Sequence, residues 1–275
     1  MADVLSPSFL IGNATVMLAP QGSDVFALKP DTDSVGMVKQ VAVTMESDQI
    51  ELRNGILQSL VDSQKSGVRL TVTFEGYEFT AANLYRALGY AYQTVVQRRR
   101  GKLTAAITGP VTTISVASFQ IPGDSSTAIT AVGQIPVGAT ILLQKANVPD
   151  YVYPARVTAT TTGSGPYVIT VAVPTGMAFG VDDIVWVVNE VDVGSTRTDD
   201  FFCMKIAGKL SANNVPLVLI FPKVKITKGF NMTFSETDYS NMPFEVAPYF
   251  LSAVEATGRL AEIGTTMNGR AYIGA

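Results

Sequence analysis

The chain has 275 residues and a formal net charge of −3, and it contains no histidine and a single cysteine, Cys203. The lack of histidine excludes the Ser-His-Asp triad, the Cys-His dyad and His-ligated zinc, and a lone cysteine excludes an intrachain disulfide. The acidic balance argues against a protein that grips nucleic acid through its phosphates. Charged residues make up only 16% of the chain, against about 25% in an average protein, which indicates that partner subunits cover part of the surface.

The apolar runs are too short for a membrane-spanning helix, which needs roughly 20 residues. The longest are residues 217–221 and 184–188. Residues 1–13 lack the positively charged start of a secretory signal peptide and carry Asp3. We therefore expect a protein that is made and folded in a cytoplasm, with no membrane partner.

Two alternating segments in the first third of the chain predict strands with one buried and one solvated face, at residues 41–46 and 68–75. Between them, Asn54-Gly55 is a strong hairpin signal. More than twenty residues separate the two strands, which is long for a plain connection, so we predict a long loop that packs on another chain. The residues predicted to make this contact are Ile50, Leu52, Arg53, Asn54, Gly55, Ile56, Leu57 and Leu60.

One helix is predicted after these strands, and Gly89 is expected to weaken it and to lie near its end. Thr80 can cap its N-terminus, and the apolar stripe consists of Ala81, Leu84, Leu88 and Tyr92. The arginines at residues 98–100 follow, and they suit the partial negative charge at a helix C-terminus.

The composition changes in the middle of the chain, where only six charged residues lie between Leu103 and Asn189. Short strand-like runs alternate there with Gly-Pro turn signals, which predicts a small all-β sandwich or barrel. Trp186 is expected in its core. We place an inserted domain at residues 106–195, and an outer domain at 1–105 and 196–275. The runs predicted as strands of the insert are residues 113–116, 140–143, 152–157, 168–173 and 184–188.

The last third continues with strands. The apolar run 217–221 predicts a strand buried on both faces, and 224–227 and 230–235 alternate. Pro222 and Lys223 are predicted to form a turn or bend between the first two. Cys203 lies among apolar neighbours and is expected to be buried.

No catalytic, metal or cofactor site is predicted. Adjacent or alternate aspartates are candidate metal ligands or acid–base pairs, but aspartate also favours turns, and neighbours on a strand point in opposite directions. We therefore predict that the protein is not an enzyme and needs no cofactor. The pairs in question are Asp31/Asp33, Asp182/Asp183 and Asp199/Asp200.

The order of these segments resembles the tail tube proteins, or major tail proteins, of tailed bacteriophages. The resemblance rests on residues 35–43, 67–75 and the helix from Ala81 in the first half. In the second half it rests on 218–226, with its Phe-Pro-Lys motif, and 242–248, with its Pro-Phe-Glu motif. It implies a mainly β fold of the tail-tube type, a sandwich or barrel of two sheets with a flanking helix, which carries the insert as an extra all-β domain.

The resemblance also implies a function. Family members form hexameric rings that stack into a hollow tube and conduct the genome, so the expected location is the virion tail, assembled in the host cytoplasm. Expected partners are further copies of the chain, the tape measure, the terminator, and a sheath or baseplate protein. DNA would touch the lumen only transiently and without sequence specificity. By polarity, the candidate lumen residues are Arg69, Thr71, Thr73 and Glu75.

Two alternatives stay open at this point. Another tail ring protein, such as a terminator or a baseplate hub, would share the fold but stop at one ring. The insert could instead bind a carbohydrate or receptor, with Tyr151, Tyr153 and Tyr167 as a stacking surface.

Overall fold

The structure, a computed structural model, describes residues 14–54, 59–91, 99–120, 135, 137–160, 167–174, 176–194, 198–210, 215–232 and 240–273. The protein is mainly β, with 57% strand and 7% helix. It divides into two compact units, Met1–Gln93 with Val193–Ala275, and Thr94–Asp192. The change in composition predicts these boundaries at residues 105 and 196, whereas strand β4 (Arg99–Leu103) pairs with strands of the second unit.

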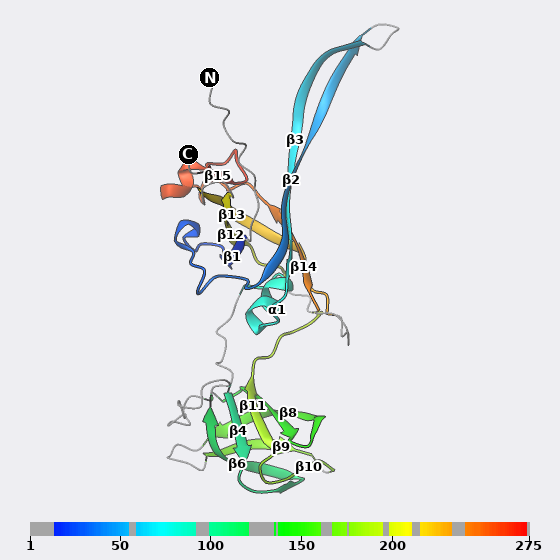
Figure 1. Ribbon diagram of the computed structural model, residues 1–275, viewed down its shortest axis with the longest axis vertical. Helices are drawn as coiled ribbons and strands as arrows, with labels where there is room; N and C mark the ends of the chain where they lie inside the picture. Colours follow the sequence, from blue (N-terminus) through cyan, green and yellow to red (C-terminus); the bar gives the residue numbers. More distant parts are fainter. Residues whose placement is uncertain are drawn as a thin grey trace, which may run out of the picture. The chain divides into compact units, whose positions relative to one another are not determined.

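The first unit is built on one antiparallel seven-stranded sheet in the order β1-β12-β13-β14-β3-β2, with β15 paired to β13 (Figure 1). The family resemblance implies two sheets here, whereas the described strands form a single one. β1 and β2 are its outermost strands. The strands are β1 (Thr15–Pro20), β2 (Val38–Asn54), β3 (Ser59–Gly76), β12 (Phe202–Leu210), β13 (Val215–Lys228), β14 (Met242–Pro248) and β15 (Arg270–Ile273).

Two apolar clusters cover the two faces of this sheet. The larger one includes Phe74, Phe244 and Leu84, the last from helix α1 (Ala81–Ala87). The smaller one lies where residues of β1, β12 and β13 meet Val25 and Ile263, next to the short helices η1 (Val25–Ala27) and η3 (Gly258–Glu262). The second face of the sheet is therefore covered at β1, β12 and β13, while alternate residues of β3 and β2 on that face remain accessible.

Cys203 is buried in the smaller cluster, as predicted. Burial raises the pKa of its thiol to about 11. The thiol is therefore protonated and poorly reactive at neutral pH.

The predicted turn at Pro222 and Lys223 is not formed, because β13 runs unbroken through both residues. Proline has no N–H to donate, so within a sheet it is confined to edges and bulges. The pairing of β13 with β12 shifts register between Phe221 and Val224, which places Pro222 in a bulge. On the other side, β13 pairs with β15 up to Ile220 and with β14 from Val224, so Pro222 also falls between two partner strands.

The predicted long loop between residues 46 and 68 is also absent. β2 and β3, of 17 and 18 residues, continue as a paired ladder from Val38 opposite Gly76 to Asn54 opposite Ser59. The strands thus extend far beyond the rest of the sheet (Figure 1), and we call residues 43–54 and 59–68 the arm. The last described pair of the ladder is Asn54 with Ser59, and the predicted Asn-Gly turn lies in residues 55–58, outside the described part of the chain.

The helix begins at the predicted cap and ends next to Gly89, as predicted. The Thr80 side chain accepts a hydrogen bond from Asn83 N (3.2 Å), which caps the first turn. α1 ends at Ala87, because Gly89 takes a φ of +77° that a continuing helix does not allow. Arg99 and Arg100 therefore do not lie at a helix end but belong to β4.

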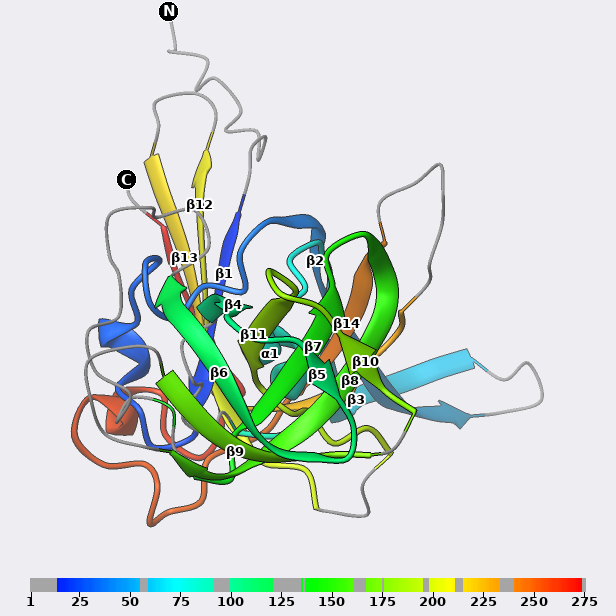
Figure 2. The ribbon, with the colours of Figure 1, turned by 90° about the horizontal axis from the view of Figure 1, so that it is seen from below.

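The second unit is a closed six-stranded barrel in the order β11-β4-β6-β9-β8-β7 (Figure 2). All five predicted strands of the insert are present. Closure gives each of the six barrel strands two neighbours, so no described strand of the barrel is an edge strand. The remaining strands are β6 (Val111–Gln120), β7 (Thr140–Lys145), β8 (Val148–Thr160), β9 (Tyr167–Val173) and β11 (Ile184–Val188), with a small ladder of β5 (Ile107–Thr108) and β10 (Ala178–Phe179).

Trp186 is not in the barrel core, contrary to prediction. Along β11, Val185 and Val187 are fully buried, so alternation turns Trp186 outward, where it is half-buried. Its indole Nε1 donates to Gln144 Oε1 (2.8 Å), and the Arg100 guanidinium lies 5.4 Å from the ring centroid.

The chain passes between the two units twice. Within each unit, the segments next to the two crossings are hydrogen-bonded to each other. In the first unit, Asp200 N donates to Gly89 O (2.8 Å) and Asp200 Oδ2 accepts from Ala91 N (2.7 Å). In the second unit, the first and last strands, β4 and β11, pair directly.

A polar clamp fixes the C-terminal part of the first unit. The Glu255 carboxylate accepts hydrogen bonds from the backbone and hydroxyl of Ser252 (2.7 and 2.8 Å), from Lys223 Nζ (2.9 Å) and from Gln21 Nε2. These bonds, the Ser252 backbone bond first, lower the pKa of Glu255 from 4.5 to about 2. The charged form therefore stabilises the native state.

Glu255→Gln is expected to lower stability at neutral pH, because the amide cannot replace the charge-assisted bonds. The folded-state pKa is depressed, so the carboxylate's contribution is complete above about pH 4.5 and is lost as the pH falls towards 2. Urea unfolding of both proteins between pH 2 and 7 checks this. At pH 7 the wild type should have a higher free energy of unfolding than the variant, and this difference should shrink below pH 4.5. A difference that does not vary with pH would contradict the stabilising role of the ionised Glu255 carboxylate.

Candidate assembly surface

In each of the three aspartate pairs, a carboxylate accepts hydrogen bonds from backbone amides or forms an ion pair with a lysine. Asp183 accepts from the amides of Ala146 and Gly180 (2.9 and 2.7 Å), and Asp33 accepts from that of Lys29 (2.8 Å). Asp199 lies 3.3 Å from Lys225. In the described ranges, no three His, Cys, Asp or Glu side chains gather as a metal site would require.

The apolar face of the sheet continues from the core onto the base of the arm. Opposed residues share a face, and Val43 lies opposite Val72 while Met45 lies opposite Leu70. Val72 is fully buried, but the exposed fractions of Val43, Met45 and Val68 are 40%, 63% and 39%. These last three residues, which we call the arm stripe, carry the apolar pattern of a buried strand out into solvent.

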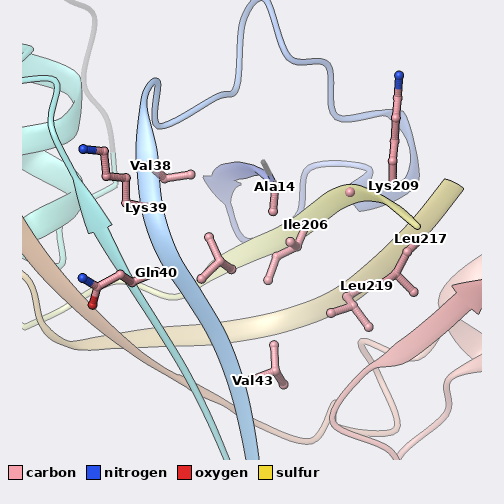
Figure 3. Close-up of a pocket in the computed structure, with 11 residues that line it drawn as sticks. Ala14, Val38, Lys39, Gln40, Val43, Ile206, Lys209, Leu217 and Leu219 are labelled. Carbon is pink, nitrogen blue, oxygen red and sulfur yellow. The ribbon is translucent and has the colours of Figure 1, made fainter. Parts of the chain in front are cut away.

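An apolar groove of about 370 Å³ lies on the same face, between the start of β2 and strands β12 and β13 (Figure 3). Aliphatic side chains from all three strands face it, and the amino groups of Lys39 and Lys209 point away from them (Figure 3). Val43 belongs both to the groove and to the arm stripe, so the two form one continuous apolar surface. The groove is lined by Ala14, Val38, Lys39, Gln40, Val41, Val43, Ile206, Gly208, Lys209, Leu217 and Leu219.

A bulge sets the direction in which β2 leaves the groove. The register with β3 shifts between Lys39 and Ala42, and Gln40, within this shift, has a φ of +53°. A left-handed backbone costs a non-glycine residue about 1–2 kcal/mol. Bulges bend and twist a strand, so this one aims the arm.

Gln40→Val is expected to destabilise the protein by about 1–3 kcal/mol, because a β-branched residue fits a left-handed φ worst. Gln40→Gly should be neutral or stabilising, since glycine adopts this φ freely. Guanidinium unfolding of the two variants measures both effects. Equal stabilities for the two would contradict the strain at Gln40.

The four candidate lumen residues share the opposite face of β3, as alternation requires. Arg69 and Thr73 are exposed, and Thr71 and Glu75 are half-buried. Across the ladder, Glu46 lies opposite Arg69 and Lys39 opposite Glu75, so charges of both signs alternate on this face. The Tyr77 hydroxyl donates to Glu75 Oε2 (2.8 Å), and this bond raises the pKa of Tyr77. Such a balanced face has no cluster of cations to hold phosphates.

The predicted contact residues near the hairpin end lie on the arm where they are described. The Ile50 side chain is 66% exposed, and Arg53 is exposed and pairs with Glu51 (2.5 Å). The backbones of Leu52, Asn54 and Leu60 are in the ladder. Gly55, Ile56 and Leu57 lie outside the described residues. The arm stripe is not among the predicted contact residues, although the alternation at residues 41–46 is a signal for it.

The tyrosines proposed as a stacking surface all pack on the barrel core, and only Tyr151 and Tyr153 of the three are half-buried. Tyr167 is buried in the barrel core. The Tyr151 ring packs edge-to-face on Phe179, and its hydroxyl contacts Met177 Sδ (3.1 Å). The Tyr153 hydroxyl contacts Ala172 O (3.5 Å).

No protein-family model matches the chain, and no curated protein is significantly similar to it. Within the described residues, no helix is long and apolar enough to cross a membrane. A functional proposal rests instead on three features of the first unit: the arm, the groove, and the edge of β2 that pairs with no described strand.

Proposed function

We propose that the protein is a tail tube subunit, a structural virion protein whose copies form hexameric rings that stack into a hollow conduit for a phage genome. The observation that carries this proposal is the continuous apolar surface of groove and arm stripe on a chain that is only 16% charged. Exposed apolar surface of this kind marks a protein–protein interface. The family resemblance supplies the hexamer and the tube.

The edges of the sheet support homotypic assembly. Among the described strands, β2 pairs only with β3, so its other edge offers unpaired backbone groups along 17 residues. The outer edge of β1 is partly covered, because Val35 N and Leu18 N bond Val16 O and Asp33 O (2.9 and 3.0 Å). An open edge is a template for another strand, and joining edges around a ring would satisfy it.

The polar face of β3 fits the lumen of such a conduit. Its alternating charges would neither hold nor strongly repel a polyanion, which suits a channel that lets DNA slide. The proposed protein makes and breaks no covalent bond, so it needs no cofactor. The barrel, closed on itself, would be carried as a separate module.

Negative-stain electron microscopy of the purified full chain tests the proposal. We expect sixfold rings that stack into hollow tubes. Single rings that never stack would favour a terminator or hub instead. A monodisperse monomer at millimolar concentration would overturn the proposal.

A further inference from the structure

We propose that the end of the barrel where β4 begins is a binding site for a carboxylate, which the buried guanidinium of Arg99 would hold. The inference goes beyond the proposed function, because it concerns the barrel and does not depend on assembly through the sheet. Arg99 is the first residue of β4, and β11, β7 and β8 follow β4 in turn around the barrel wall.

Arg99 lies on the inner face of the barrel. It is opposite Val187 of β11, and opposed residues share a face of a sheet. Val187 is fully buried in the barrel core, and along β4 the next residues on the same face, Gly101 and Leu103, are buried as well. Arg99 itself is only 8% exposed. The strand therefore carries a charged side chain into the end of an apolar core.

The Arg99 guanidinium has no partner among the described residues. Its Nε and Nη1 atoms are buried and make no hydrogen bond, and no described carboxylate forms an ion pair with it. Burial lowers the pKa of Arg99, but an arginine remains charged at neutral pH. A buried charge without a partner strongly destabilises a fold, whereas a bound anion would satisfy both the charge and the N–H groups.

The charges around Arg99 favour an anion. Arg100 follows it on β4, and Arg156 on β8 lies opposite Thr140, in the row of residues next to that of Arg99. Both are exposed and make no ion pair with the described part of the chain. The Glu190 carboxylate lies in the same region and accepts a hydrogen bond from the Thr140 hydroxyl. The three arginines give this end a local positive charge in a chain whose net charge is −3, and such a field attracts anions.

A carboxylate matches the site in shape and in charge. The guanidinium is planar, and two of its N–H groups can meet the two oxygens of a carboxylate in parallel. A carboxylate brings one negative charge, which balances one buried arginine, whereas a phosphate group carries nearly two. Beside Arg99 the inner face is apolar: one step further into the barrel, a Cβ added at Gly101 would lie 3.1 Å from Phe119 Cδ1. The ligand would therefore be a carboxylate on a short apolar group.

Thermal unfolding of the full chain in increasing sodium acetate tests the inference, with sodium chloride at equal ionic strength as the reference. We expect the unfolding temperature of the barrel to rise in the wild type by about 5–10 °C once acetate exceeds its dissociation constant tenfold. Arg99→Met should not respond to acetate. In chloride it should unfold at the same temperature as the wild type or higher, because it removes a buried charge without a partner. Arg259→Met, at an exposed arginine of the first unit, is the control and should respond as the wild type does.

Three other outcomes would overturn the inference. A wild type that does not respond to acetate, with Arg99→Met less stable in chloride, would mean that the chain itself satisfies the guanidinium. An equal rise in the wild type and in Arg99→Met would mean that acetate acts elsewhere. A rise in inorganic phosphate that acetate does not produce would assign the site to phosphate instead of a carboxylate.

Discussion

Met45→Asp is expected to abolish the proposed ring and tube assembly while the subunit remains folded. The Met45 side chain is 63% exposed in the free subunit, so a carboxylate there stays solvated. In an assembly that buries the arm stripe, the same carboxylate would enter an aliphatic environment without a partner. Burying such a charge costs several kcal/mol, which corresponds to a loss of about a thousandfold or more in association at each contact.

Thr44→Asp is the matched control, because Thr44 is the preceding residue, is exposed, and lies on the opposite face of the arm. Both variants add one negative charge, and each should change the free energy of unfolding by no more than about 1 kcal/mol. Sedimentation velocity and electron microscopy measure assembly, and thermal unfolding measures the fold. Normal tubes from Met45→Asp would show that the arm stripe is not an assembly contact, and equal loss in Thr44→Asp would point to charge alone.

Phe74→Ala is expected to lower the stability of the first unit by about 3–5 kcal/mol, the largest effect of any single substitution that we predict. Phe74 and Phe244 lie directly opposite each other on β3 and β14, with ring centroids 4.7 Å apart and ring planes 12° apart. Both side chains are 2% exposed. Alanine would leave a cavity beneath the base of the arm and remove this stacked contact.

Denaturant unfolding followed by circular dichroism measures the effect. The two units have separate apolar cores, so we expect the transition of the first unit to move while that of the barrel does not. Phe250→Ala, at a side chain that is 48% exposed, is the control and should cost far less. A similar loss in both variants would mean that the Phe74–Phe244 pair is not central to the core.

Local patterns in the sequence predict the structure correctly where the side chains pack directly into a core or bond to the nearby backbone. The barrel strands, the cap at Thr80 and the burial of Cys203 follow from alternation, capping chemistry and apolar neighbours. The end of α1 near Gly89 follows as well, because glycine readily adopts the left-handed backbone that ends a helix. A proline interrupts the hydrogen bonds of most central strands. β13 accepts Pro222 because this residue lies in a bulge against β12 and, on the other side, between the partner strands β15 and β14.

The assembly surface was harder to predict for a physical reason. Val41, Val43 and Met45 alternate identically, yet Val41 packs against the core and Met45 does not. Alternation says which residues share a face, but it does not say what covers that face. The prediction therefore placed the contact at the hairpin end, around Ile50 and Leu52, and left out the base of the arm. Only the length of the β2–β3 ladder shows that the alternating apolar residues continue beyond the part of the sheet that the core covers.

Because the two chain crossings lie side by side, the barrel could be replaced by another folded module. Its first and last strands are neighbours, so its two ends are separated by about one strand spacing, close to 4.8 Å. In the first unit, the two places where the chain leaves and returns, at Gly89 and Asp200, are equally close, because a hydrogen bond joins them. Any independently folding module whose termini lie side by side could replace the barrel at almost no loop-closure cost. A scaffold of this kind would display a chosen cargo once per subunit, at a spacing set by the host alone.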